Sequence, residues 1–236
     1  MLAPVWRTSP RLDDGGGVWG PLSTEGTTIY AGTGNTCSED PSRYGDSIVA
    51  LTPDLRMRWH VSTRAPGIED SDVGGGVAVL GQHAYVSSKR GYFYELDRTN
   101  GRVRARDDSE PFARNGGGIA TPTGDGTVLL VSGGEKSDSA KDAEPGAVVT
   151  AFGLDGAVKY RMESERPLTR YAAFVAGVGF IALDRRLIAF DAASGATLWS
   201  APLGDFAYAA PVVVSSGVCA ANDAGDVFAF APPQLR

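Results

Sequence analysis

Leu187-Ile-Ala-Phe-Asp-Ala-Ala-Ser-Gly-Ala-Thr-Leu-Trp199 contains, in order, a short apolar run, a turn and a second run that ends in an aromatic residue. The apolar run predicts a buried strand, and the Ser-Gly pair supplies residues that tolerate the positive φ of a hairpin turn. The segment therefore predicts two antiparallel strands, with Trp199 placed to pack against a neighbouring sheet.

The same apolar run occurs four more times along the chain. The copies are Ser47–Leu51, Tyr92–Leu96, Val148–Phe152 and Asp226–Phe230. Successive copies are 45, 56, 38 and 40 residues apart when their last apolar residues are aligned. Trp59 and Tyr160 follow two of these runs as Trp199 does in its own copy, whereas the copy at Tyr92–Leu96 lacks the aromatic residue. A period of 20 to 50 residues indicates a repeat architecture.

Small residues precede the apolar runs. Glycine triplets occur at 15–17, 74–76 and 116–118, and Ala172-Ala173 and Ala209-Ala210 take the same place in the later copies. Glycine usually weakens a strand, but it lets backbones approach closely where inner strands converge on an axis. Since no phosphate-loop lysine or helix follows the second and third triplets, we interpret them as repeat architecture.

Four-stranded repeats of this length around an axis are typical of a β-propeller. We therefore expect an all-β chain and one propeller domain over residues 1–236, with repeats at roughly 7–59, 60–105, 106–160, 161–199 and 200–236 plus 1–6. The segment Ala3-Pro-Val-Trp6 resembles the last strand of a blade. Either it completes the fifth blade and closes a five-bladed ring, or the chain is an incomplete arc of an eight-bladed propeller.

The composition argues against several classes of function. The net charge is −6 and the basic residues are scattered, so nucleic acid is not an expected partner. No run of 18 apolar residues indicates a membrane span, and the N-terminus lacks the pattern of a signal peptide. Cys37 and Cys219 fit neither a disulfide framework nor a metal site, so we expect free thiols, with one long-range bridge as the alternative.

Four segments together are more specific than the repeat. They are Gly15-Gly-Gly-Val-Trp-Gly20, Ile29-Tyr-Ala-Gly-Thr-Gly-Asn35, Pro66-Gly-Ile-Glu-Asp-Ser-Asp-Val-Gly74 and Ser88-Lys-Arg-Gly-Tyr-Phe-Tyr-Glu-Leu-Asp-Arg-Thr-Asn-Gly101. In order and spacing they resemble the quinoprotein alcohol dehydrogenases, propeller enzymes that use pyrroloquinoline quinone and usually calcium. The resemblance is densest from Gly15 to Gly101.

The resemblance implies roles for four residues. Trp19 would be the flat floor on which the quinone lies, and Asn35 would coordinate the metal through its amide oxygen. Asp70 would be the catalytic base that takes the alcohol proton. Lys89 would hold a positive charge beside the quinone oxygens.

Each of these residues also has an interpretation without a cofactor. Trp19 would be an inter-blade tryptophan, Asn35 a turn residue, Asp70 a turn cap and Lys89 part of an exposed hairpin tip. The segment at Pro66 departs from the family pattern, with Gly67 and Ile68 where the family has His-Asp. The family's metal-binding glutamate and vicinal disulfide have no counterpart in this chain.

Two functions stay open on these grounds. In the first, the chain is part of a quinone-dependent alcohol or polyol dehydrogenase. It would then be an enzyme only if the full protein contains the missing N-terminal blades. The other is a non-catalytic propeller that binds a protein or a ligand and holds no cofactor. The resemblance implies a periplasmic or extracellular location, with a small alcohol or a protein as partner.

Overall fold

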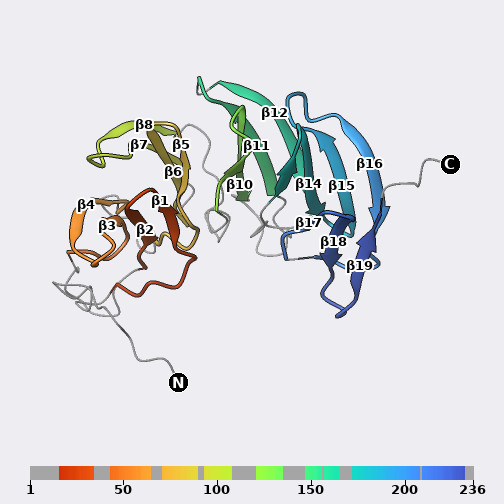
Figure 1. Cartoon of the computed structure of the whole chain (residues 1–236), viewed down its shortest axis with the longest axis horizontal. Helices are drawn as coiled ribbons and strands as arrows, with labels where there is room; N and C mark the ends of the chain where they lie inside the picture. The colour runs from red at the N-terminus through yellow and green to blue at the C-terminus, as the bar shows by residue number, and fades with distance from the viewer. Residues whose placement is uncertain are drawn as a thin grey trace, which may run out of the picture. The chain divides into compact units, whose positions relative to one another are not determined.

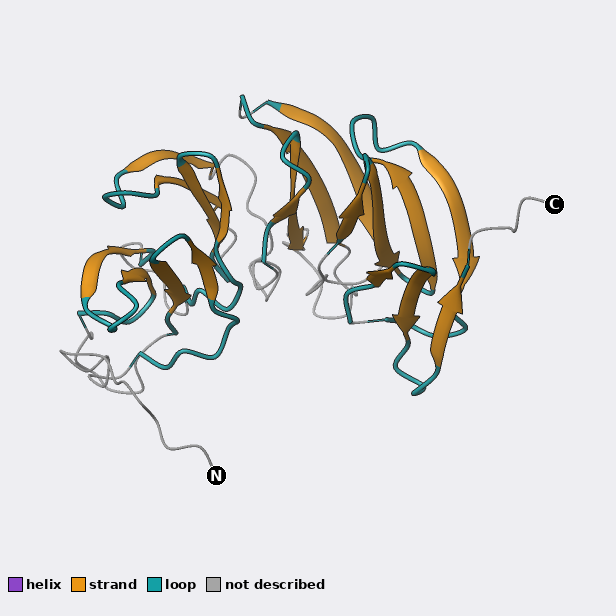
Figure 2. Cartoon of the chain, viewed as in Figure 1, coloured by secondary structure: helices purple, strands orange, loops and turns teal. Residues whose placement is uncertain are grey.

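The computed structural model describes residues 16–34, 43–64, 71–89, 93–107, 121–134, 147–155, 157–164, 172–207 and 209–231. These residues form β-strands, turns and loops, without a helix (Figure 2). The chain divides into two compact units, Met1–Pro122 and Thr123–Arg236. In both units every sheet is antiparallel with its strands in sequence order, which confirms the predicted all-β fold of propeller blades (Figure 1).

The first unit contains two four-stranded sheets. The first sheet comprises β1 (Ser23–Glu25), β2 (Thr28–Gly32), β3 (Ser47–Leu51) and β4 (Met57–Ser62). The second comprises β5 (Ala78–Leu80), β6 (His83–Ser87), β7 (Phe93–Asp97) and β8 (Val103–Asp107). One apolar core joins the two sheets, with Tyr30, Ile48, Trp59, Val73 and Leu96 among its buried residues.

The described residues of the second unit form two four-stranded sheets and one three-stranded sheet. The first comprises β9 (Thr123–Gly124), β10 (Val128–Gly134), β11 (Ala147–Gly153) and β12 (Val158–Ser164). The next comprises β13 (Ala173–Val175), β14 (Val178–Leu183), β15 (Arg186–Asp191) and β16 (Thr197–Pro202). The last comprises β17 (Val212–Val214), β18 (Gly217–Ala221) and β19 (Val227–Phe230).

The repeated apolar runs form strands, as predicted, and the structure places them as the third strands of the five sheets. β3, β7, β11 and β15 also share an irregularity of pairing with the fourth strand at one equivalent position. It falls between Ala50 and Leu51, Glu95 and Leu96, Ala151 and Phe152, and Ala189 and Phe190. A bulge bends and twists a strand, so its repetition gives the four sheets the same local twist.

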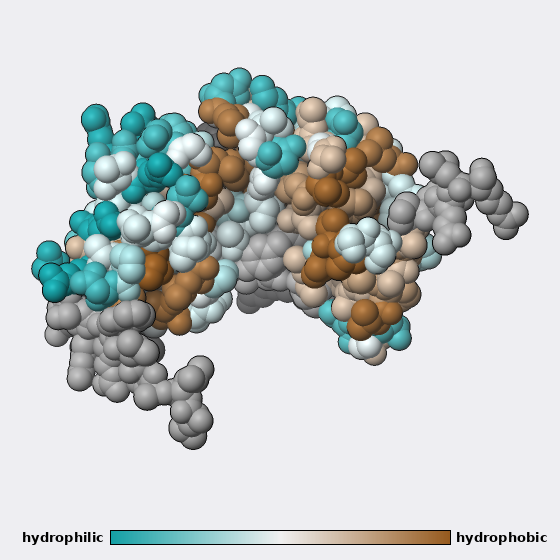
Figure 3. Space-filling model, viewed as in Figure 1, coloured by the Kyte–Doolittle hydropathy of each residue, from teal (hydrophilic) through white to brown (hydrophobic). Residues whose placement is uncertain are grey.

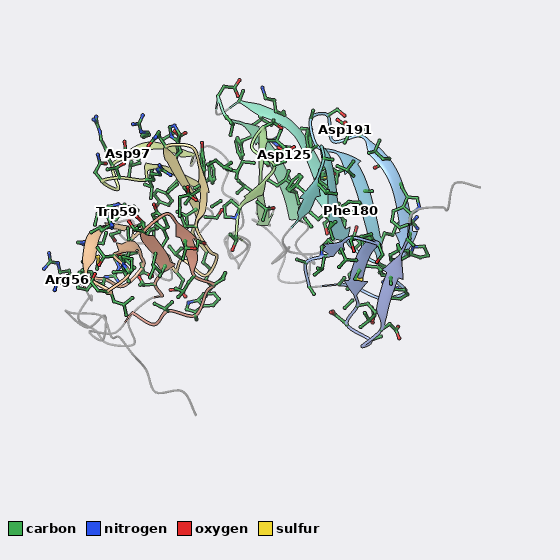
Figure 4. All side chains as sticks on the ribbon, viewed as in Figure 1. Arg56, Trp59, Asp97, Asp125, Phe180 and Asp191 are labelled. Atoms are coloured by element: carbon green, nitrogen blue, oxygen red, sulfur yellow. The ribbon has the colours of Figure 1, made fainter. Side chains whose placement is uncertain are left out.

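The aromatic residues near the start of the fourth strands pack on the next sheet, as predicted, although each strand continues beyond its aromatic residue. Trp59 donates its indole N–H to the carbonyl of Arg98 at 3.1 Å, and the Tyr160 hydroxyl donates to the carbonyl of Ala192 at 2.9 Å. Both rings lie on a glycine of the receiving turn, Gly101 or Gly195, and each glycine has a φ of 74°. Asp97 and Asp191 begin these two equivalent turns (Figure 4).

The glycines before the first strands lie in connecting segments rather than in strands. Gly20 and Gly74 precede β1 and β5, and a Cβ on Gly20 would lie 2.3 Å from the Gly74 carbonyl oxygen. Close backbone approach is therefore the reason for glycine here, although no strand is involved. The third triplet, at 116–118, and the segment Pro4–Trp6 lie outside the described residues, so closure of a ring stays a prediction.

Candidate functional site

Two of the four predicted site residues, Trp19 and Lys89, lie in the described part of the chain. Asn35 and Asp70 lie outside it, each next to a described residue, Gly34 and Ser71. The site is therefore built here from Trp19, from Lys89 and from the segments that flank Asn35 and Asp70.

The indole of Trp19 lies across two glycines of the first unit. A Cβ on Gly34 would be 2.9 Å from Nε1 of the ring, and a Cβ on Gly74 would be 2.1 Å from Cη2. The ring therefore rests directly on backbone at both of its ends. Trp19 is nevertheless 52% exposed, whereas Trp59 in the same unit is 8% exposed. An aromatic ring that is supported on glycine and otherwise open presents a flat apolar surface.

Backbone hydrogen bonds join the segments that carry the four predicted residues. Gly34 N–H donates to the Gly17 carbonyl at 2.8 Å, and Val73 N–H donates to the Thr33 carbonyl at 3.1 Å. Lys89 N–H donates to the carbonyl of Asp72 at 2.7 Å. The structure thus brings the four segments side by side at one end of the strands, beyond Gly32 of β2 and Ser87 of β6.

Lys89 and Asp72 form the charged part of this region. The Lys89 ammonium lies 4.0 Å from Oδ2 of Asp72, and the two side chains are 31% and 8% exposed. A partly open lysine held by a buried carboxylate keeps its charge in a fixed place while it still reaches solvent. Such an arrangement can bind a neutral or anionic oxygen.

Sequence reasoning missed a buried polar cluster behind these segments. Asp46 accepts hydrogen bonds from Arg64 Nε at 3.0 Å and from an Arg64 terminal nitrogen at 2.7 Å, both on Oδ2. Its backbone N–H donates to the Gly34 carbonyl at 3.0 Å, and Thr63 Oγ1 donates to its carbonyl at 2.8 Å. The cluster thereby fixes the backbone just before Asn35. The positive φ of Asp46, 46°, is a backbone feature that its sequence does not indicate.

The described residues contain no group of three or more His, Cys, Asp or Glu side chains that could hold a metal ion. The predicted metal ligand, Asn35, lies outside the described residues and would use an amide oxygen.

Cys219 is a free thiol, and Cys37 lies outside the described residues. The described residues form no helix that could span a membrane.

The second unit has a cavity of a different kind. It measures about 730 Å³ and lies between the last two sheets, where Phe180, Trp199 and Phe230 line it together with Val175, Val213 and Val218. Trp199 packs edge to face on Phe230, with ring centroids 5.2 Å apart, and stays 41% exposed. Apolar residues cover much of the visible surface of this unit (Figure 3).

Comparison with known proteins supports a propeller of the PQQ-like class. Residues 145–232 match the PQQ_2 family, described as outer membrane protein assembly factor BamB. This match covers less than half of the chain and, together with the fold, confirms the expected resemblance to propellers of the PQQ-like class. No curated protein matches the sequence.

Solved structures share the fold over most of the chain. A quinohemoprotein alcohol dehydrogenase from Comamonas testosteroni gives a TM-score of 0.69 at 18% identity, over 94% of this chain and 46% of that one. A europium-containing methanol dehydrogenase gives 0.64 at 16% identity, over 90% and 50%. BamB from Moraxella catarrhalis gives 0.51 at 15% identity, over 90% and 76%. This chain spans about half the length of the two dehydrogenases, and at these identities the likeness shows the fold alone.

Proposed function

We propose that the first unit forms one wall of a quinone-binding site in an oxidoreductase of the quinoprotein alcohol dehydrogenase type. The observation that carries the proposal is the indole of Trp19, which rests on Gly34 and Gly74 and is 52% exposed. Trp59, which packs between the two blades of the same unit, is only 8% exposed. A half-open indole on a rigid backbone suits a flat aromatic ligand.

The residues of this wall fit a quinone. Trp19 would bind one face of the ring system, and Lys89 would place its ammonium near the quinone oxygens. The Asp72 carboxylate, 4.0 Å from that ammonium, would keep the lysine in position. A positive charge that is already in place stabilises negative charge that develops during a reaction. When bound, a quinone of this type accepts the hydride of an alcohol that is oxidised.

Two further roles follow from the resemblance alone. Asn35 would supply an oxygen ligand to calcium, and Asp70 would accept the proton of the alcohol hydroxyl. Gly34 and Ser71, their described neighbours, belong to the joined segments around Trp19, which supports one common site. The substrate would be a small alcohol or polyol. The remaining walls of the site would come from further blades of a larger propeller, and the protein would work in the periplasm or outside the cell.

Reconstitution of the chain with calcium and pyrroloquinoline quinone tests this function. We expect the quinone to raise the melting temperature in a concentration-dependent way, since a ligand that binds only the folded state stabilises it by mass action. Dye reduction with short alcohols then reports activity. Absence of both binding and a thermal shift would exclude quinone binding by this chain. Binding without dye reduction would support a wall that needs further blades for catalysis.

A non-catalytic scaffold is the second candidate, and the last sheet favours it. Within the described residues, β19 is the outer strand of a three-stranded sheet, and its Val227 is 78% exposed. The apolar cavity of about 730 Å³ lies beside this sheet, and the family matched by residues 145–232 is described as an outer membrane assembly factor. An exposed strand with an apolar pocket beside it suits a protein partner that adds a strand.

Crosslinking tests the scaffold function. A photo-crosslinking residue at position 227 should capture a defined protein partner. The purified partner should then bind the chain directly, and Val227→Asp should weaken that binding at least tenfold. The same probe at the exposed position 56 is the control. Equal capture from both positions would contradict a specific docking strand.

A further inference from the structure

A small polar pocket lies between the two sheets of the first unit. Its volume is about 290 Å³, and it is lined by Tyr30, Arg58, Arg98, Glu25 and Thr27, with Thr28 beside them. Thr28 begins β2, whereas the region around Trp19 lies beyond the other end of that strand, after Gly32. This pocket is therefore separate from the proposed quinone wall.

Two arginines supply most of the hydrogen-bond donors of the pocket. A terminal nitrogen of Arg58 donates to the carbonyl of Thr27 at 3.3 Å and to its hydroxyl at 3.2 Å. A terminal nitrogen of Arg98 donates to Glu25 Oε1 at 3.3 Å. Each guanidinium has five N–H groups, so these bonds leave donors for a ligand. With two cations and one carboxylate, the lining is net positive.

The floor of the pocket is a buried hydroxyl. Tyr30 is 1% exposed, and its hydroxyl donates a long hydrogen bond of 3.5 Å to the carbonyl of Arg98. Burial raises the pKa of Tyr30, while the hydrogen bond from Thr28 and the charges of Arg98 and Arg58 act in the opposite direction. Both guanidinium charges therefore act on this hydroxyl, which stays protonated near neutral pH and gives its one hydrogen to the Arg98 carbonyl.

We propose that this pocket binds a small oxyanion, a phosphate or carboxylate group, between Arg58 and Arg98. Guanidinium groups match the geometry of such anions, and hydrogen bonds between charged groups are the stronger ones. The volume of about 290 Å³ lies at the small end of ligand pockets and suits one such group rather than a large ligand. Glu25 holds one donor of Arg98 in the free protein, so an incoming anion competes with this carboxylate.

Glu25 makes the proposal testable in two directions. Removal of an arginine should weaken binding, whereas Glu25→Gln removes the competing charge and should strengthen it. If the arginines only fixed the hairpin turns, Glu25→Gln would not change any anion affinity. Because Glu25→Gln should increase the anion affinity, the test stays decisive even if an arginine variant folds poorly.

Nuclear magnetic resonance of the whole chain provides a local readout. The indole N–H of Trp59 donates to the carbonyl of Arg98 at 3.1 Å, so its resonance should respond to an anion bound by Arg98. Inorganic phosphate and malonate are titrated separately at constant ionic strength, with chloride as the balancing anion. We expect a saturable shift, and the anion that binds more tightly identifies the class of ligand.

Variants then test the residues. Arg58→Gln and Arg98→Gln should each raise the dissociation constant about tenfold, the loss of one charge-assisted contact, and Glu25→Gln should lower it about threefold. Arg56→Gln removes the same charge two positions from Arg58, at a side chain (Figure 4) that is 79% exposed and does not line the pocket, so it should change nothing. A non-saturable shift, an equal effect of Arg56→Gln, or an unchanged affinity in Glu25→Gln would overturn the proposal.

Discussion

Trp19 and Gly74 are in direct contact, ring against backbone: a Cβ built on Gly74 would lie 2.1 Å from Cη2 of the indole and 2.5 Å from Cζ2. Real Cβ atoms do not approach other atoms so closely, so the indole can occupy this place only because residue 74 is glycine. A repeat glycine, explained from the sequence by close backbone approach, thus also supports the half-open ring on which the proposed function depends.

Gly74→Ala should displace the ring of Trp19. Because the new Cβ would overlap the indole, we expect the free energy of unfolding to fall by about 2 kcal/mol, as in other overpacked sites. Urea denaturation measures the loss, and the fluorescence of Trp19 reports its displacement. Gly17→Ala is the matched control, since a Cβ there meets no atom within 4 Å. A Gly74→Ala protein as stable as the control, with unchanged fluorescence, would show that the ring does not rest on this glycine.

Trp59→Phe should destabilise the first unit more than Trp199→Phe destabilises the second. Trp59 is 8% exposed and loses its 3.1 Å hydrogen bond to Arg98, so we expect a loss of about 2 kcal/mol. Trp199 is 41% exposed and should cost less than about 1 kcal/mol. Urea unfolding followed by circular dichroism measures both changes. Equal losses would contradict the different packing of the two indoles.

Arg64→Gln should leave the carboxylate of Asp46 buried without its charged partner. The Asp46 side chain is 3% exposed, so we expect a loss of about 2 kcal/mol in the free energy of unfolding. Arg104→Gln removes the same charge from the pair with Asp97, where Arg104 is 48% exposed, and should cost much less than Arg64→Gln. Thermal and urea denaturation of both variants test the difference. A larger loss in Arg104→Gln would reverse the assignment of the buried pair.

Tyr160 should make the second unit lose stability at high pH. Burial, then the negative charges of Asp125 and Asp191, raises the pKa of this phenol from 10.0 to about 12. The stabilisation is complete below pH 10, where the phenol is neutral in both states, and is lost as the pH rises toward 12, because the unfolded chain ionises first. Urea midpoints between pH 9 and 12 measure the slope. Tyr160→Phe should reduce this slope, and an unchanged slope would exclude Tyr160 as its source.

The repeat made most of the fold predictable. The five apolar runs are the third strands, and the aromatic positions of Trp59 and Tyr160 make the contacts with the next sheet that their places predict. Both signals are local, since a central strand is apolar and a hairpin turn needs glycine or a small polar residue. The first strands were not predictable in this way. β9 is Thr123–Gly124 and β1 is Ser23–Glu25, too short to show a period of two residues.

The candidate site was less predictable than the fold. The resemblance selected Trp19 and Lys89, and the structure places both in segments that are joined by backbone hydrogen bonds. The resemblance could not select Asp46 or Arg64, because the burial of Asp46 beside Arg64 depends on turns from different strands that pack together. Nothing in a polar stretch such as Tyr44-Gly-Asp46 distinguishes a buried aspartate from an exposed one. The roles of Asn35 and Asp70 stay predictions.

The most direct test of the central claim is to titrate pyrroloquinoline quinone, with calcium present, into the wild-type chain and into Trp19→Ala. The wild-type chain should bind the quinone and lose tryptophan fluorescence on binding. Trp19→Ala should bind at least tenfold more weakly, the cost of about 1.4 kcal/mol or more of lost stacking. Trp199→Ala, the control with a 41% exposed indole in the other unit, should bind as the wild type does. Binding that is equal in Trp19→Ala and the wild type, or absent from both, would contradict the assignment of Trp19 as the floor of a quinone site.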